Sequence, residues 1–78
     1  MTFKGHSEEV ASVAISPDGK LVASASKDKF LKLWELKTGQ LISTIPHQQT
    51  VNTVAFSLDG KMVATGCDDQ MIRLFPVV

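Results

Sequence analysis

The sequence contains one cysteine, no excess of either charge and no long apolar run. A lone cysteine, Cys67, cannot form a disulfide within the chain, so we expect a reducing, intracellular and cytoplasmic setting. Eight basic side chains balance eight acidic ones, which predicts no nucleic-acid partner. Apolar runs such as Leu21-Val22-Ala23 fall far short of the ~20 residues of a membrane span, and residues 1–6 lack a secretory signal. We therefore expect no membrane partner.

Motifs for cofactors are also missing, since the chain holds no GxGxxG, no P-loop and no CxxC. We therefore predict no cofactor. Cys67 stands where Ser26 stands in an earlier copy of the same pattern. We interpret it as a small strand residue instead of a reactive thiol, because no paired base or metal-ligand spacing lies nearby.

A repeat is the most informative feature that is present. The segment Ser16-Pro17-Asp18-Gly19-Lys20 returns 41 residues later as Ser57-Leu58-Asp59-Gly60-Lys61, and the register holds without a gap along the chain. A period of 20–50 residues is typical of stacked supersecondary units, and about three or more units are normally needed to bury their apolar faces. Two copies therefore predict a missing partner.

Each copy has the pattern of short strands separated by turns. We predict strands at residues 10–15, 20–26, 30–36 and 40–45 in the first copy, and at 51–56, 61–66 and 70–75 in the second. Pro17 and the Asp18-Gly19 pair favour a tight turn. The predicted fold class is all-β, with two β-propeller blades of antiparallel strands, the second lacking its outer strand.

The first copy resembles a WD40 repeat in four segments, namely Gly5-His6, Val10-x-x-Val13-x-Ile15-Ser16-Pro17-Asp18-Gly19, Ala23-Ser24-Ala25-Ser26-Lys27-Asp28 and Leu31-Lys32-Leu33-Trp34-Glu35. In the second copy Pro46-His47 replaces Gly-His, Leu58 replaces the turn proline, and Phe75-Pro76 replaces Trp-Asp. The resemblance implies two repeats, at residues 1–45 and 46–78, with residues 1–4 as the remnant of a fourth strand. It implies a non-catalytic scaffold for protein–protein interaction.

The resemblance also implies a structural hydrogen-bond set in each repeat. In the first repeat its members are His6, Ser24, Asp28 and Trp34, and in the second His47, Thr65 and Asp69. A carboxylate accepts one imidazole N–H, and the hydroxyl links the other ring nitrogen to the indole N–H. Phe75 has no N–H, so the last link is missing from the second set and we expect a less rigid second blade.

A Ser, His and Asp together also suggest a hydrolase. The trio recurs once per repeat, however, and no G-x-S-x-G elbow is present. We therefore expect no enzyme and no catalytic residue. His6 and His47 would lie on neighbouring sheets ~10 Å apart, too far apart to share a metal ion whose ligands lie ~2 Å away.

WD40 propellers bind partners at the narrow top face, and the resemblance carries this to six positions. They are Glu9, Ala11 and Lys27 in the first repeat, and Thr50, Asn52 and Asp68 in the second. These side chains are candidate partner contacts, or else solvated loop residues. Lys27 against Asp68 reverses the charge between the two repeats.

Two stacked blades leave two apolar faces open, which marks an association site. One interpretation is a segment of a larger propeller, whose further blades or other proteins cover these faces. Another is a self-assembling structural fragment that closes as a homo-oligomer, with six blades from three chains or eight from four. A third is a regulatory propeller fragment of a larger multidomain enzyme. Residues 1–4 could replace the missing strand of an adjacent copy.

Overall fold

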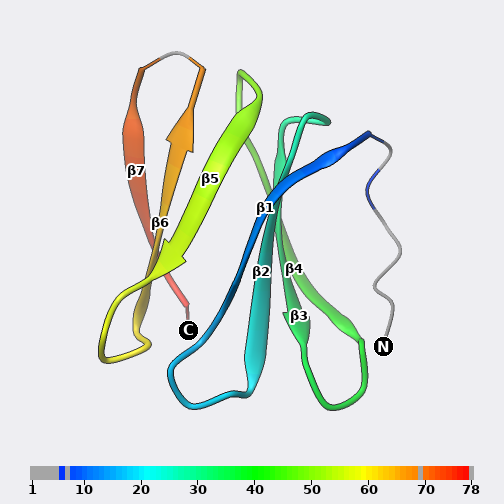
Figure 1. Ribbon diagram of the computed structural model, residues 1–78, viewed down its shortest axis with the longest axis vertical. Helices are drawn as coiled ribbons and strands as arrows, with labels where there is room; N and C mark the ends of the chain where they lie inside the picture. Colours follow the sequence, from blue (N-terminus) through cyan, green and yellow to red (C-terminus); the bar gives the residue numbers. More distant parts are fainter. Residues whose placement is uncertain (1–5, 7, 69, 78) are drawn as a thin grey trace.

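Two antiparallel sheets make up the part of the chain that the computed structural model describes, residues 6, 8–68 and 70–77 (Figure 1). The first sheet orders β1 (Val10–Ile15), β2 (Leu21–Ser26), β3 (Phe30–Glu35) and β4 (Leu41–Pro46) as β1-β2-β3-β4. The second orders β5 (Val51–Phe56), β6 (Met62–Cys67) and β7 (Ile72–Pro76) as β5-β6-β7. The predicted all-β fold, with a second blade that lacks an outer strand, is confirmed.

The turn between β1 and β2 explains why β2 starts at Leu21, one residue later than predicted. Asp18 Oδ1 accepts the Lys20 N–H at 3.0 Å, so Lys20 belongs to the turn. Gly19 closes the turn through an N–H bond to the Ser16 carbonyl, with φ at 74°, a conformation that favours glycine. A similar bond from the Gly39 N–H to the Glu35 carbonyl ends β3 one residue early.

The repeat extends to the irregularities of the backbone. The register between β1 and β2 shifts between Val10 and Ser12, and the register between β5 and β6 shifts between Val51 and Thr53. Ala11 and Asn52 are therefore the additional residues of equivalent β-bulges. The two sheets place equivalent residues at equivalent positions, even where the ladder is interrupted.

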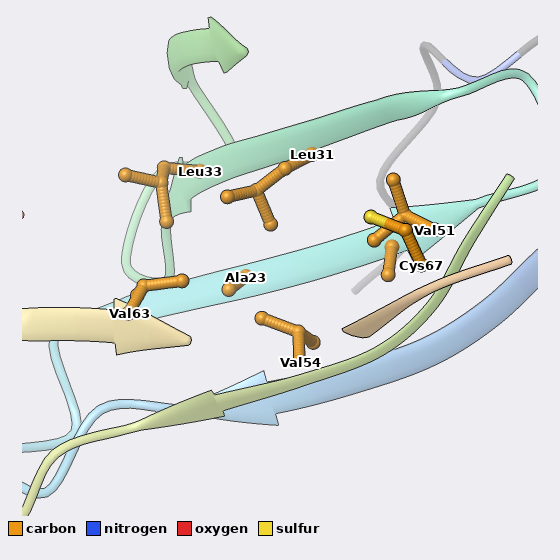
Figure 2. Close-up of a cluster of buried hydrophobic side chains, with 8 residues drawn as sticks. Ala23, Leu31, Leu33, Val51, Val54, Val63 and Cys67 are labelled. Carbon is orange, nitrogen blue, oxygen red and sulfur yellow. The ribbon is translucent and has the colours of Figure 1, made fainter. Parts of the chain in front are cut away.

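The core lies between the two sheets (Figure 2). Ala23, Leu31 and Leu33 of the first sheet point toward side chains of the second, where Val51, Val54, Val63 and Cys67 are buried. Strand β5 contacts both β1 and β2, so the sheets pack face to face (Figure 1). Each fully buried Leu or Val side chain contributes about 1.5–3 kcal/mol, which makes this contact the main source of stability.

Two of the sequence predictions fall on residues that are not described. The strand remnant at residues 1–4 and the side chain of Asp69 both lie outside the described residues. Within the described part, no helix has the length and apolar character to cross a membrane.

Candidate functional site

The structure brings the four polar residues of the first predicted set together through Ser24. The Trp34 Nε1–H donates to Ser24 Oγ at 2.9 Å, and His6 Nε2 lies 2.6 Å from the same oxygen. His6 Nδ1 lies 2.8 Å from Asp28 Oδ2. Because indole can only donate, the serine hydroxyl proton is directed to His6 Nε2, and the imidazole then carries its proton on Nδ1 toward Asp28.

Asp28 also fixes the reversal between β2 and β3. Its Oδ1 accepts the Phe30 N–H at 3.0 Å, while its own N–H donates to Ser26 Oγ at 3.2 Å. Ser26 Oγ in turn donates to the Glu9 carbonyl at 3.2 Å. Lys27 therefore lies between Ser26 and Asp28, whose side chains both form hydrogen bonds to the backbone, so the position of the Lys27 backbone is fixed.

The second predicted set differs from the first in its partners. His47 Nε2 lies 3.1 Å from Thr65 Oγ1, as His6 does from Ser24, but His47 Nδ1 lies 3.2 Å from the Ile45 carbonyl. Phe75 packs its ring edge against the imidazole, with centroids 5.4 Å apart and planes at 69°. The aromatic residue thus supplies a packing contact here but no hydrogen bond to the threonine.

The six candidate contact residues lie at the same end of the strands in both sheets, where β1 and β5 begin and β2 and β6 end (Figure 1). We call this end of the strands an edge of the two sheets, and the end with the Asp18 and Asp59 turns the opposite edge. The Lys27 N–H donates to the Glu9 carbonyl, and the Asp68 N–H donates to the Thr50 carbonyl, both at 3.0 Å. The side chains are exposed except that of Thr50, which is half-buried. The bulges at Ala11 and Asn52 direct these two residues to the edge.

Sequence reasoning missed that four of these candidates pair with one another. Lys27 Nζ lies 3.3 Å from Glu9 Oε1, and Asn52 Nδ2 donates to Asp68 Oδ1. The pairing depends on the register seen in the structure, where Val10 opposite Ser26 places residues 9 and 27 across from each other. Of the six candidates, those of the first sheet thereby carry no net charge, whereas those of the second carry the negative charge of Asp68.

Two aspartates with lowered pKa values lie at the opposite edge of the sheets. Hydrogen bonds from the Ser16 hydroxyl, at 2.6 Å, and from the Lys20 backbone N–H lower the pKa of Asp18 below its ordinary value. The Ser57 hydroxyl and the Lys61 N–H lower the pKa of Asp59 in the same way. Both carboxylates are fully engaged in closing turns, so neither is positioned for acid–base chemistry.

The described surface is hollowed at the turn edge and on the open face of the first sheet. The larger, of about 790 Å³, lies at this turn edge between residues 18–21 and 35–38. The smaller, of about 150 Å³, lies on the open face of the first sheet and is lined by His6, Val10, Val13, Val22, Ser24 and Trp34. Within the described residues no three His, Cys, Asp or Glu side chains are grouped as metal ligands.

Known proteins resemble this chain in sequence and in structure. The curated protein "Ribosome biogenesis protein BOP1 homolog" is 44% identical over 45 residues in both Drosophila virilis and Drosophila melanogaster. These matches cover 58% of this chain and 6% of the relatives. The chain therefore spans only a small part of their length.

Two solved structures share the arrangement of both sheets. "Structure of U3-55K" superposes with a TM-score of 0.91 at 27% identity, over 95% of this chain and 25% of that one. "Crystal structure of RRP9 WD40 repeats" gives a TM-score of 0.91 at 28% identity, over 95% and 24% of the two chains. The family profile "WD domain, G-beta repeat" matches residues 1–35 and 39–75. This chain therefore belongs to the WD40 repeat family.

Proposed function

We propose that this chain is a non-catalytic scaffold that binds other proteins through the edge formed by Glu9, Ala11, Lys27, Thr50, Asn52 and Asp68. One observation carries the proposal: equivalent side chains of two adjacent sheets, all but Thr50 exposed, lie at a single edge, each group held by a backbone bond of 3.0 Å. An edge fixed in advance loses little conformational freedom when a partner docks. The hydrogen-bond sets of His6 and His47 lie beside this edge and stabilise it.

The charge of this edge favours a protein partner over RNA. Glu9 neutralises Lys27 across 3.3 Å, and Asp68 adds a negative charge on the second sheet. Phosphate-backbone binding draws its affinity from unneutralised lysine and arginine, whereas Lys27, the one basic residue among the six, lies beside the Glu9 carboxylate. A basic side chain of a partner protein, by contrast, would find the exposed Asp68 carboxylate here.

Ser24 supports the non-catalytic assignment. The hydroxyl beside His6 and Asp28 is buried, and it accepts the indole N–H of Trp34. A nucleophilic serine must present its Oγ to a substrate carbonyl, whereas this oxygen is already bonded to both Trp34 Nε1 and His6 Nε2. We infer that the two hydrogen-bond sets are structural, one in each of two repeats at residues 1–45 and 46–78.

The relatives suggest a cellular context. Because the similar curated proteins are named for ribosome biogenesis, we propose that this scaffold acts in the assembly of ribosomes. Such a role places the chain inside the cell, in agreement with the expectation from the lone cysteine.

Site-specific photo-crosslinking in cells tests the proposed edge. A crosslinker at Ala11 or Asn52, both exposed bulge residues, should yield adducts with proteins, whereas one at Thr38 on the opposite edge should not. Asp68→Lys should reduce the adducts several-fold, and the control change Leu58→Lys, at a fully exposed turn position of the other edge, should not. Equal adducts from Thr38, or adducts with RNA alone, would contradict the proposal.

A second candidate function is self-assembly into a closed propeller. The observation that favours it is the exposure of apolar side chains on both outer faces, Val13 and Ile15 on the first sheet and Ile72 and Leu74 on the second. Apolar faces of this kind are association sites. A homo-oligomer of three or four chains would bury them.

A further inference from the structure

The two equivalent turns at the edge opposite the partner contacts each contain a reactive pair of residues. Asp18-Gly19 joins β1 to β2, and Asp59-Gly60 joins β5 to β6 (Figure 1). In an Asp-Gly pair the backbone nitrogen of glycine can attack the carboxyl carbon of the aspartate, because glycine has no side chain to hinder the approach. The carboxyl hydroxyl and the amide proton leave as water, and a five-membered cyclic imide forms.

The imide determines the product of this reaction. Addition of water opens the ring at either of its two carbonyl groups. One opening restores aspartate, and the other gives isoaspartate, in which the backbone continues through the former side-chain carboxyl group. An Asp-Gly turn is therefore a potential site of covalent modification that needs only water.

The folded turns hold both reacting groups in hydrogen bonds. In the first turn the Gly19 N–H donates to the Ser16 carbonyl at 2.9 Å, and Asp18 Oδ1 accepts the Ser16 hydroxyl at 2.6 Å and the Lys20 N–H at 3.0 Å. The second turn repeats these three bonds around Asp59 with the same lengths. The attacking nitrogen and the carboxylate must leave these bonds before they can react, so the reaction requires local opening of the turn.

The charge of the carboxyl groups acts in the same direction. The imide forms from a neutral carboxyl group, because its hydroxyl must leave. The serine hydroxyl, followed by the backbone N–H two residues after the aspartate, lowers the pKa of both Asp18 and Asp59. An open turn loses these donors, so opening both frees the carboxyl group and favours its neutral form.

The two turns differ in what resists opening. Pro17 precedes the aspartate of the first turn, and its ring fixes φ in the open as well as in the closed state. Leu58 takes this place in the second turn, is 99% exposed and lacks such a restraint. Ser16 is 5% exposed, whereas Ser57 is half-buried, so water competes better for its hydroxyl. The second turn therefore opens more often.

We propose that Asp59 is a site of isoaspartate formation in the folded chain, and that Asp18, in the same sequence pattern, is protected. Isoaspartate at this position adds one carbon to the backbone and moves the carboxylate, so the Ser57 hydroxyl and the Lys61 N–H lose their acceptor. The turn between β5 and β6 is then weakened while that of the first sheet stays intact. The site lies at the edge opposite the partner contacts, so this inference does not depend on the proposed scaffold function.

The test compares the two sites within one molecule. The native protein is incubated at neutral pH and digested with trypsin, which releases Asp18 and Asp59 in separate peptides that end at Lys20 and Lys61. The aspartate and isoaspartate forms of a peptide have the same mass, separate by chromatography and are identified by electron-transfer fragmentation. The same incubation in urea gives the rate of each site in the open chain, which corrects for any intrinsic difference between the two sequences.

We expect isoaspartate to form at both sites in urea. In the native protein the rate at Asp59, divided by its rate in urea, should exceed that at Asp18 by about two- to fivefold, the effect of a proline that fits its turn. Leu58→Pro, which copies the first turn, should slow the reaction at Asp59, and the reciprocal change Pro17→Leu should accelerate it at Asp18. Circular dichroism verifies that each variant is folded.

A further pair of variants tests the serine hydroxyl. Ser57→Ala should accelerate the reaction at Asp59 several-fold and leave Asp18 unchanged, because one bond to the carboxylate is lost in the second turn only. Ser16→Ala should have the reciprocal effect. Each variant thus retains an unmodified turn as its internal control.

Three results would overturn the inference. Equal protection of the two aspartates in the native protein, or faster reaction at Asp18, contradicts the difference between the turns. A native rate equal to the urea rate at both sites shows that the turn bonds do not govern the reaction. An unchanged rate at Asp59 in folded Leu58→Pro shows that the residue before the aspartate does not control opening. The comparison within the native protein stands even if a variant fails to fold.

Discussion

Ser24 joins two aromatic residues through one hydroxyl group. Its oxygen accepts from the Trp34 indole at 2.9 Å and lies 2.6 Å from His6 Nε2. Removing the hydroxyl leaves two nitrogens without this partner, whereas removing the indole N–H leaves only an oxygen that still contacts His6. The serine is therefore the more sensitive of the two positions.

We expect Ser24→Ala to lower the free energy of unfolding by about 2 kcal/mol, because unmatched buried polar groups are costly. Trp34→Phe, which copies Phe75 of the second sheet, should remove one hydrogen bond worth about 1 kcal/mol together with part of the buried ring. Urea unfolding followed by circular dichroism measures both. Ser43→Ala, in a half-buried serine of β4, is the control. Similar losses for Ser24→Ala and Ser43→Ala would contradict the role of the hydroxyl.

Asp18 gives a prediction for pH. Its pKa is lowered in the folded chain mainly by the Ser16 hydroxyl. A lowered pKa contributes stability that is complete above the unfolded carboxyl value and is lost as the pH falls through the folded value. Ser16→Ala should raise the pKa of Asp18 toward 3.8, its ordinary value, and flatten the loss of stability in acid.

Titration of the Asp18 carboxyl carbon by NMR measures this shift. The Asp59 carboxyl serves as an internal control, because its own hydroxyl donor, Ser57, is unchanged in the variant. A Ser16→Ala chain in which both carboxyl groups titrate as before would contradict the assignment.

The polar set could be predicted from the sequence because its residue types and spacing recur in a known repeat. The ion pair between Glu9 and Lys27 could not, because both side chains are exposed and sample many rotamers. Knowing that residues 9 and 27 face each other requires the register across the bulge. The sequence does not state that register, because a bulge adds one residue without a distinct residue type.

Strands were predictable where turns mark their ends. Asp18-Gly19 and Asp59-Gly60 separate β1 from β2 and β5 from β6, and the predicted β1 and β5 match the observed bounds. The other strands differ from the prediction by a residue or two at an end, as at Leu21, because side chains such as Asp18 compete with the ladder for backbone N–H groups. Local chemistry of this kind decides boundaries that hydrophobic patterns leave open.

The pairing of β5 with β6 yields a prediction of its own. A methyl group added at Gly66 would lie 2.8 Å from Thr53 Cγ2 across the ladder. The first sheet has Ala25 opposite Ser12 at the same place, without that methyl. Gly66→Ala should therefore lower the free energy of unfolding by about 1 kcal/mol, since the crowding exceeds the entropy gained from losing a glycine.

Combining this change with Thr53→Ser recreates the pair of the first sheet. The double variant should be more stable than Gly66→Ala alone, as judged by urea unfolding of both single variants and the double. A coupling of about 1 kcal/mol is expected for residues in direct contact. Strictly additive effects would show that the second sheet adjusts to the methyl group without cost.

The whole molecule was the least predictable level. The sequence predicts two stacked blades, but β2 carries buried residues on both of its faces, so hydrophobic alternation does not reveal which face is turned inward. Only the packed structure shows that the side of the first sheet with Leu31 and Leu33 meets the side of the second with Val54 and Val63.

Cys67 has a consequence for measuring how the two halves separate. Its side chain is buried in the cluster between the sheets, and it is the single cysteine of the chain. A thiol-modifying reagent can reach the sulfur only when the halves part, so the labelling rate under native conditions reports the frequency of that opening. We expect Leu31→Ala to accelerate labelling and Leu58→Asp to leave it unchanged. The chain thus contains its own chemical reporter of transient opening.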